Sequence, residues 1–228
     1  MSASNVEMIQ LKIMYLFMNA DGMCGEVENE RFNAICEELK TSEEDKNEIA
    51  EFIKGFDFSK NEDNSEVAIR AIGMLLGYIK ENKDGEDQND VINSSSVAFG
   101  ALQAFCVASK QLSQTLGKSV SAHLINKNKV RQAHTIWTLI NLGYADSMLV
   151  PSEQKVIDYL ISIWEMDDVL TRTLFDTAET SLALQAKKDW ILSTDKTEEK
   201  IDELCNEIDK EIKKMYVDVE LTISEANI

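Results

Sequence analysis

The chain has 228 residues, enough for one large domain or two small ones. Its single proline and nine glycines are too few for the many tight turns of a β-sandwich. With 41 acidic and 23 basic side chains, the net charge of −18 argues against nucleic acid as a partner, because phosphate binding draws on a positive surface. No stretch is long and apolar enough to predict a transmembrane segment, although peripheral contact with a membrane surface stays open.

The N-terminal segment and the cysteines both indicate a compartment. The segment lacks the basic start and the small-residue cleavage site of a secretory signal. The cysteines form no CxxC pair, and we expect free thiols at Cys24, Cys36, Cys106 and Cys205. We therefore predict a cytoplasmic protein.

Apolar residues recur at intervals of three and four almost throughout the chain, which is the period of one helix face. This pattern predicts helices over about 6–17, 32–39, 42–55, 65–80, 130–143, 151–164, 168–175 and 196–219. A polar stretch at 81–90 is the best candidate for a linker. The fold class predicted from this pattern is all-α.

A window without acidic residues interrupts this acidic chain. From Val91 to Ala145 there is no Asp or Glu, and there are five basic residues. Small residues recur there at every fourth position, namely Ser96, Gly100, Ala104 and Ala108. Such a stripe permits close approach of another backbone, either within the fold or from a partner. The basic side chains could dock on the acidic remainder of the chain or on an acidic partner.

The last predicted helix is strongly charged and carries one apolar seam. Its residues alternate at spacings of four and three after the first step, as in a coiled coil, and they are Ile201, Cys205, Ile208, Ile212, Met215 and Val219. The pattern leaves open whether this seam packs on the same chain or on another one.

The chain resembles itself at an offset of 125 residues. Ala20-Asp21 corresponds to Ala145-Asp146, and Glu28 corresponds to Glu153. In both copies an apolar helix is followed by Ala-Asp, a short loop, a glutamate and an amphipathic helix. A two-residue gap in the loop would pair Glu30 with Glu153 instead. Duplicated units of this kind commonly cover each other's apolar faces.

The duplicated motif resembles that of the TerB-like family, which is named for a tellurite-resistance protein. The resemblance implies a helical bundle with two pseudo-repeats, to which this chain adds a helical insertion and a C-terminal helix that are not part of the usual domain. It places a TerB-like domain at 1–190, with the acid-free insertion at about 91–128, and a charged helix and tail at 191–228. The chain departs from the family pattern at Ser147, where the family favours glycine, and in the longer first loop.

The acidic loops are the candidate metal site. Carboxylates without His or Cys suit hard cations such as Ca²⁺ or Mg²⁺, and the resemblance also points to these acids. The candidate ligands are Asp21, Glu26, Glu28, Glu30, Asp146 and Glu153. The alternative is local: an aspartate in a turn holds backbone N–H groups, and a glutamate in the first helical turn favours the helix dipole.

Motifs of nucleophilic or phosphate-transfer enzymes do not occur, and we name no catalytic residue. The leading hypothesis is a non-enzymatic TerB-like module of stress response, related in type to tellurite resistance. It would bind protein partners and a divalent cation through its duplicated Asp…Glu loops. The alternative is an oligomeric structural or interaction protein whose acidic loops are only turns and helix caps.

Overall fold

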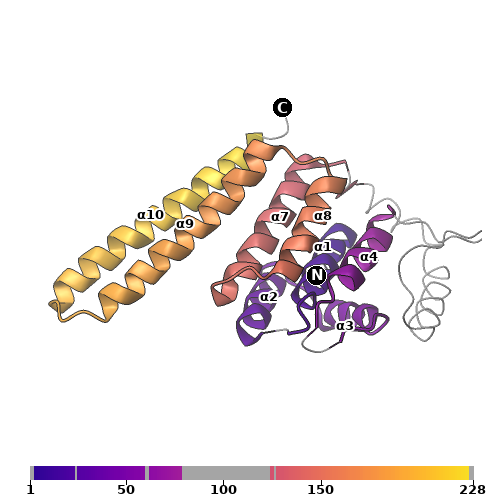
Figure 1. Ribbon diagram of the computed structural model, residues 1–228, viewed down its shortest axis with the longest axis horizontal. Helices are drawn as coiled ribbons and strands as arrows, with labels where there is room; N and C mark the ends of the chain where they lie inside the picture. Colours follow the sequence, from indigo (N-terminus) through magenta and orange to yellow (C-terminus); the bar gives the residue numbers. More distant parts are fainter. Residues whose placement is uncertain (1–2, 24, 60–61, 79–123, 126, 226–228) are drawn as a thin grey trace, which may run out of the picture. The chain divides into compact units, whose positions relative to one another are not determined.

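The computed structural model describes residues 3–23, 25–59, 62–78, 124–125 and 127–225. All regular elements in these ranges are helices, which confirms the all-α prediction (Figure 1). They are α1 (Asn5–Met18), α2 (Glu26–Glu38), α3 (Glu43–Ile53), α4 (Ser65–Leu76), α7 (Lys129–Gly143), the 3₁₀ turn η1 (Tyr144–Asp146), α8 (Pro151–Ile163), α9 (Asp168–Leu192) and α10 (Glu198–Glu225).

The chain divides into two compact units. The first comprises Met1–Lys127 with Val150–Val156, and the second comprises Asn128–Leu149 with Ile157–Ile228. The predicted linker at 81–90, the small-residue stripe and most of the predicted insertion lie outside the described residues. The division at 190, which falls inside α9, stays a prediction, as does the pseudo-symmetric arrangement of whole repeats.

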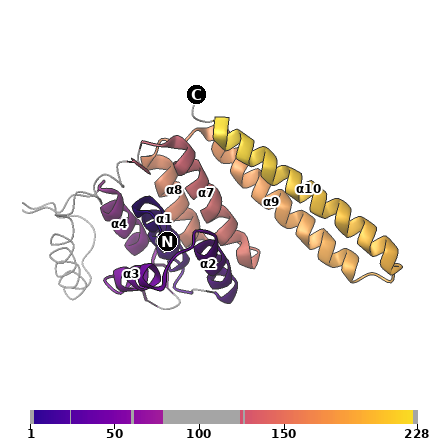
Figure 2. The ribbon, with the colours of Figure 1, turned by 180° about the vertical axis from the view of Figure 1, so that it is seen from behind.

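Helix α1 is the centre of the first unit, where α2, α3 and α4 contact it (Figure 2). It is apolar on almost every side, which is typical of a helix that other helices enclose. Ser4 and Glu7 close a capping box at its start, so the first orphan N–H groups are satisfied. Buried Lys12 keeps its charge compensated by Glu48, 2.7 Å away, and lies over the ring of Phe52.

Buried Asn64 fixes the loop before α4. Its amide nitrogen donates to the backbone oxygens of Ser59 and Glu62 at 2.8 and 3.0 Å, and its amide oxygen accepts from Ser59 N at 2.9 Å. Its backbone N–H donates to the carbonyl of Ala20 at 2.7 Å. The side chain of this one residue therefore orders the loop, and its backbone N–H holds the loop against the segment that follows α1.

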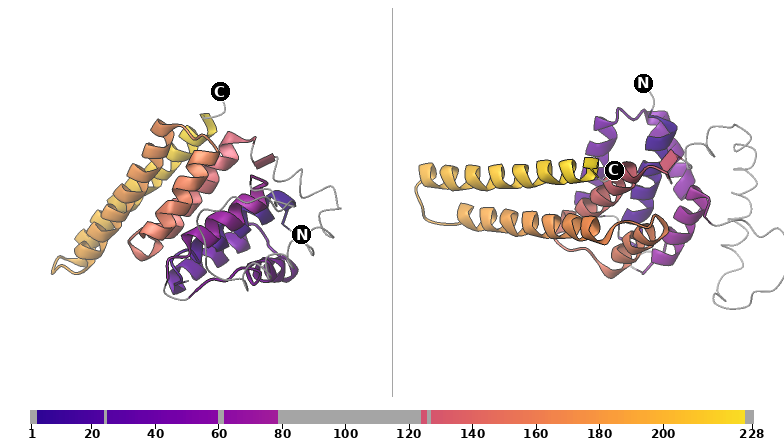
Figure 3. Two further views of the ribbon diagram at one scale, coloured as in Figure 1. Left: turned by 45° about the vertical axis from the view of Figure 1, so that its right-hand side comes forward. Right: turned by 90° about the horizontal axis from the view of Figure 1, so that it is seen from above.

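Helices α9 and α10 of the second unit form a long antiparallel hairpin, in which they lie side by side over their length (Figure 3). At 25 and 28 residues they are about 37 and 42 Å long. The α10 seam packs on α9: Cys205 and Ile208 are buried with Ile191 of α9. The sequence left open whether the seam packs on the same chain or on another one, and the structure shows it packed on the same chain.

Four predicted helix ends are wrong by more than two residues. Helix α9 continues to Leu192 rather than 175, because Ala178 and Ile191 continue its buried side. Helix α2 begins at Glu26 rather than 32.

Helix α10 continues to Glu225 rather than 219, because Ile223 extends the buried seam by one more turn. Helix α4 ends at Leu76 rather than at residue 80, because Gly77 adopts a left-handed φ of 78° that terminates the helix. Tyr78 N then donates to the carbonyl of Gly73 at 2.9 Å, which completes the cap.

Candidate functional site

The first acidic loop lies between α1 and α2. The Asp21 carboxylate accepts from Met23 N at 2.8 Å and closes a turn, and Gly22 adopts a left-handed φ of 74°. At the start of α2, Glu28 reaches back and accepts from Gly25 N at 2.9 Å. The Glu28 side chain is buried at 4% exposure, so its carboxylate is part of the folded loop rather than of the surface.

Glu26 and Glu30 differ from Glu28 in their surroundings. Both side chains are exposed to solvent on α2. Glu26 is the first residue of the helix, where a negative charge interacts favourably with the helix dipole. Neither side chain lies in the buried position where Glu28 accepts from Gly25 N.

The second acidic loop has the same local features as the first. Ser147 adopts a left-handed φ of 80°, and Glu153 accepts from Val150 N at 3.0 Å with 4% exposure. Both features match the first loop at the offset of 125 residues, with Ser147 in the place of Gly22. Serine there occupies a conformation that glycine adopts more easily.

These geometries define what the acidic residues can do chemically. Glu28 and Glu153 act as capping acceptors for backbone N–H groups at two helix starts. The side chain of Asp146 is not among the described ones. Among the side chains that are described, no group of three or more His, Cys, Asp or Glu residues is arranged to hold a metal. A cation at Glu28 would compete with the bond to Gly25 N.

An ion pair near the second loop had no signal in the sequence. Lys155 Nζ lies 2.5 Å from Asp63 Oδ2, although 92 positions separate the two residues. The bonds from Lys155 and from Ser65 lower the pKa of the Asp63 carboxyl from 3.8 to about 2. Both residues belong to the first compact unit, so the pair ties the start of α8 to the loop before α4.

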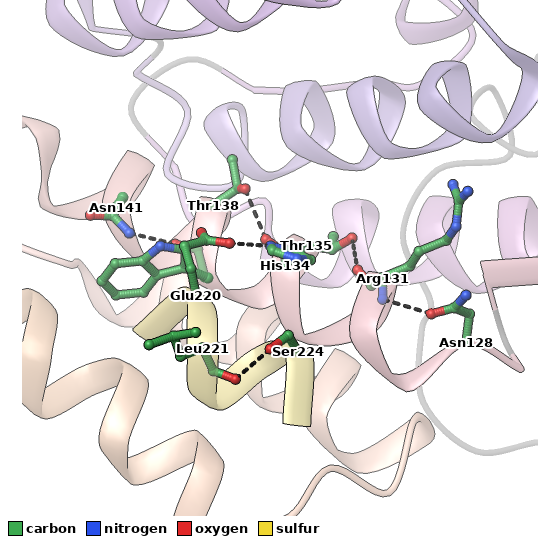
Figure 4. Close-up of polar contacts among 10 residues, drawn as sticks. Asn128, Arg131, His134, Thr135, Thr138, Asn141, Glu220, Leu221 and Ser224 are labelled. Atoms are coloured by element: carbon green, nitrogen blue, oxygen red, sulfur yellow. Dashed lines mark hydrogen bonds and ion pairs between the residues drawn. The ribbon is translucent and has the colours of Figure 1, made fainter. Parts of the chain in front are cut away.

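Polar contacts join α7 to α10, and Figure 4 shows one of them, between His134 and Glu220. His134 Nδ1 lies 3.6 Å from Glu220 Oε2, and Tyr216 donates to Asn141 Oδ1 at 2.8 Å. The ring of Tyr216 also packs on Trp137, with centroids 5.3 Å apart. These contacts hold the C-terminal half of α10.

The middle of α9 is attached to η1 by a separate bond. Tyr144 donates from its hydroxyl to Glu179 Oε1 at 3.0 Å. Burial, together with the neighbouring carboxylate, raises the pKa of Tyr144 from 10.0 to about 12. The hairpin is therefore fastened through the middle of α9 and the C-terminal half of α10, away from the end where the turn joins the two helices.

The end of the hairpin at the turn leaves large apolar side chains exposed. Trp190 is 62% and Leu192 57% exposed at the end of α9, and Lys196 lies 6.0 Å from the Trp190 ring centroid. Val217 and Leu221 are also exposed, at 50% and 56%, but they lie near the C-terminal end of α10, toward the opposite end of the hairpin from Trp190. Trp137 and Trp164 are buried, so Trp190 differs from both in exposing most of its side chain to solvent.

Comparison with known proteins finds no matching family model, no matching curated protein and no matching solved structure. Among the described helices, none combines the length and the apolar character that crossing a membrane requires. The candidate surfaces must therefore be interpreted from their own geometry.

Proposed function

We propose that this chain is a non-enzymatic protein-interaction module and that its contact surface is the α9–α10 hairpin. The observation that carries the proposal is the exposure of Trp190, Leu192, Val217 and Leu221 on one two-helix element. Scattered exposed leucines are ordinary, but an exposed tryptophan with an exposed leucine two positions away, as at the end of α9, is typical of contact surfaces.

The attachment of the hairpin supports the same proposal. Tyr144 and Asn141 fasten the hairpin through Glu179 and Tyr216, and the seam of the hairpin is closed by its own two helices. A partner can thus engage the outer surface without displacing the contacts that hold the hairpin in place. Rigid helices present a contact surface at a lower entropic cost than a loop does.

A photoreactive amino acid at position 190 tests this function in cells of the source organism. We expect irradiation to yield a discrete crosslinked protein product. The matched control carries the same group at Lys54, which is exposed on the first unit. Equal products from both positions, or none from position 190, would contradict an interaction surface at the hairpin.

Stress response is the part of the proposal that rests on the TerB-like motif alone. A strain without this protein should grow less well than its parent under tellurite or a related oxidant. Unchanged growth would remove the tellurite part and leave the interaction module.

Cation binding also stays a proposal, supported by the acidic loop composition. Calorimetric titration of chelator-treated protein with Ca²⁺ and Mg²⁺ tests it, with Asp21→Ala and Asp146→Ala as the variants that should abolish the heat. The bonds of Glu28 and Glu153 support the alternative, in which the acids act as turns and caps. Absence of saturable heat would favour that alternative.

A further inference from the structure

Six exposed residues form one continuous stripe along α10, from its first turns to its last. Their spacings are four, three, four, three and four, so they share one side of the helix, and they are Glu203, Glu207, Lys210, Lys214, Val217 and Leu221. In order they are two acids, two bases and two apolar residues. We call this set the outer stripe.

The outer stripe is distinct from the surfaces of α10 that the second unit already uses. Cys205, Ile208, Val219 and Ile223 are buried, and they form a different row of the same helix. Tyr216, as described above, faces α7. Among the described helices of the second unit, none therefore covers the outer stripe of α10.

The order of charges in the outer stripe makes it complementary to itself. If a second α10 lies antiparallel with its centre between residues 207 and 210, Glu203 faces Lys214 and Glu207 faces Lys210. The two-fold axis repeats both pairs, so each copy supplies two acids and two bases. The parallel arrangement in register would instead place like charges opposite each other, which is unfavourable.

The same register gives the apolar end of the stripe a place to pack. Val217 would lie opposite Lys200 of the second copy, and Leu221 would extend past the start of that copy's α10 at Glu198, toward the turn that holds Lys196. Lys196 is the residue above the Trp190 ring, so the exposed leucine of one copy would approach the exposed tryptophan of the other. The aliphatic stems of the two lysines would cover the remaining apolar surface.

We propose that a second copy of this chain docks antiparallel on the outer stripe of α10 to form a two-fold symmetric dimer. This inference rests on the proposed function, since it names the partner of the hairpin. The distance from residue 203 to residue 221 is about 27 Å, so the contact is elongated. Because the charge pairs are exposed, the dimer should weaken as salt screens them.

The experiment is light scattering of the full-length chain coupled to size exclusion, across a concentration series up to about 100 µM. Three variants carry charge reversals: Lys210→Glu with Lys214→Glu, Glu203→Lys with Glu207→Lys, and all four together. We expect the wild type to dimerise and each double reversal to weaken dimerisation at least tenfold, a change of about 1.4 kcal/mol. Mixing the two doubles, or combining all four reversals in one chain, should restore the dimer.

Glu37→Lys with Glu38→Lys is the matched control, because both residues are exposed on α2 and the change in net charge is the same as in the glutamate reversal. Circular dichroism checks that every variant stays helical. A wild type that is monomeric at the highest concentration would overturn the inference, as would a dimer that survives both reversals. In either case a discrete crosslink from position 190 would still support the proposed function with a different partner or surface.

Discussion

The capping glutamates allow a direct test of whether the acidic loops are structural. Glu28→Ala removes the acceptor of Gly25 N at the start of α2, and Glu153→Ala does the same for Val150 N. A helix cap contributes about 0.5–2 kcal/mol, and these two carboxylates are buried, so we expect each change to cost about 1–2 kcal/mol. In a chain of this size each kcal/mol lowers the melting temperature by about 2–4 °C.

Urea denaturation in chelator supplies the measurement, and two further variants make it specific. Glu28→Gln keeps an acceptor oxygen that can occupy the same place, so it should cost less than Glu28→Ala. Glu26→Ala changes an exposed residue of the same helix and should stay within about 0.5 kcal/mol of wild type. The reasoning is refuted if Glu28→Ala and Glu26→Ala are equally mild. It is also refuted if Glu28→Gln is as harmful as Glu28→Ala.

Three other predictions follow from the contacts described above. Because the Asp63 pKa is lowered from 3.8 to about 2, its pair with Lys155 should stabilise the fold above about pH 4, and this stabilisation should disappear as the pH falls toward 2. The urea midpoints of wild type and Asp63→Asn should therefore converge between about pH 4 and about pH 2. The pair is half exposed, so this contribution should stay below about 1 kcal/mol. Because the Tyr144 pKa is raised from 10.0 to about 12, the stability that its protonated hydroxyl contributes should persist to pH 10 and disappear toward pH 12. In an absorbance titration, Tyr144→Phe should lack the tyrosine transition that occurs at the highest pH in wild type. The same transition in both proteins would contradict this. Ile208→Ala should cost about 2–4 kcal/mol, measured as faster amide hydrogen exchange in the hairpin, and unchanged exchange there would contradict the packing of the seam.

The helical class and the α10 seam could be predicted from sequence because apolar spacing reports directly on which side of a helix is covered. The same spacing does not name the partner helix, since any apolar row of similar length fits the seam. Only the structure shows that Ile191 of α9 provides the cover. The end of α4 was missed because apolar residues continue toward Gly77, while the left-handed glycine decides where the helix stops.

The acidic residues could be found in the sequence, but their roles could not. A capping box is recognised by a serine or threonine three positions before the glutamate. The residues in that position are Gly25 and Val150, which have no side-chain acceptor, so the pattern was hidden. The pair of Lys155 with Asp63 joins positions 92 apart and depends on tertiary folding alone.

The role of Asn64 has a consequence for how this protein ages. Its amide nitrogen donates to the carbonyls of Ser59 and Glu62, and its oxygen accepts from Ser59 N. Deamidation to aspartate would keep the shape of the side chain but replace the donor with an oxygen that faces two carbonyl oxygens. A buried acceptor without a donor is costly, and here it would also carry charge. Chemical damage at this one atom would therefore loosen the loop before α4 from within, although the backbone bond from Asn64 N to the Ala20 carbonyl would keep its donor.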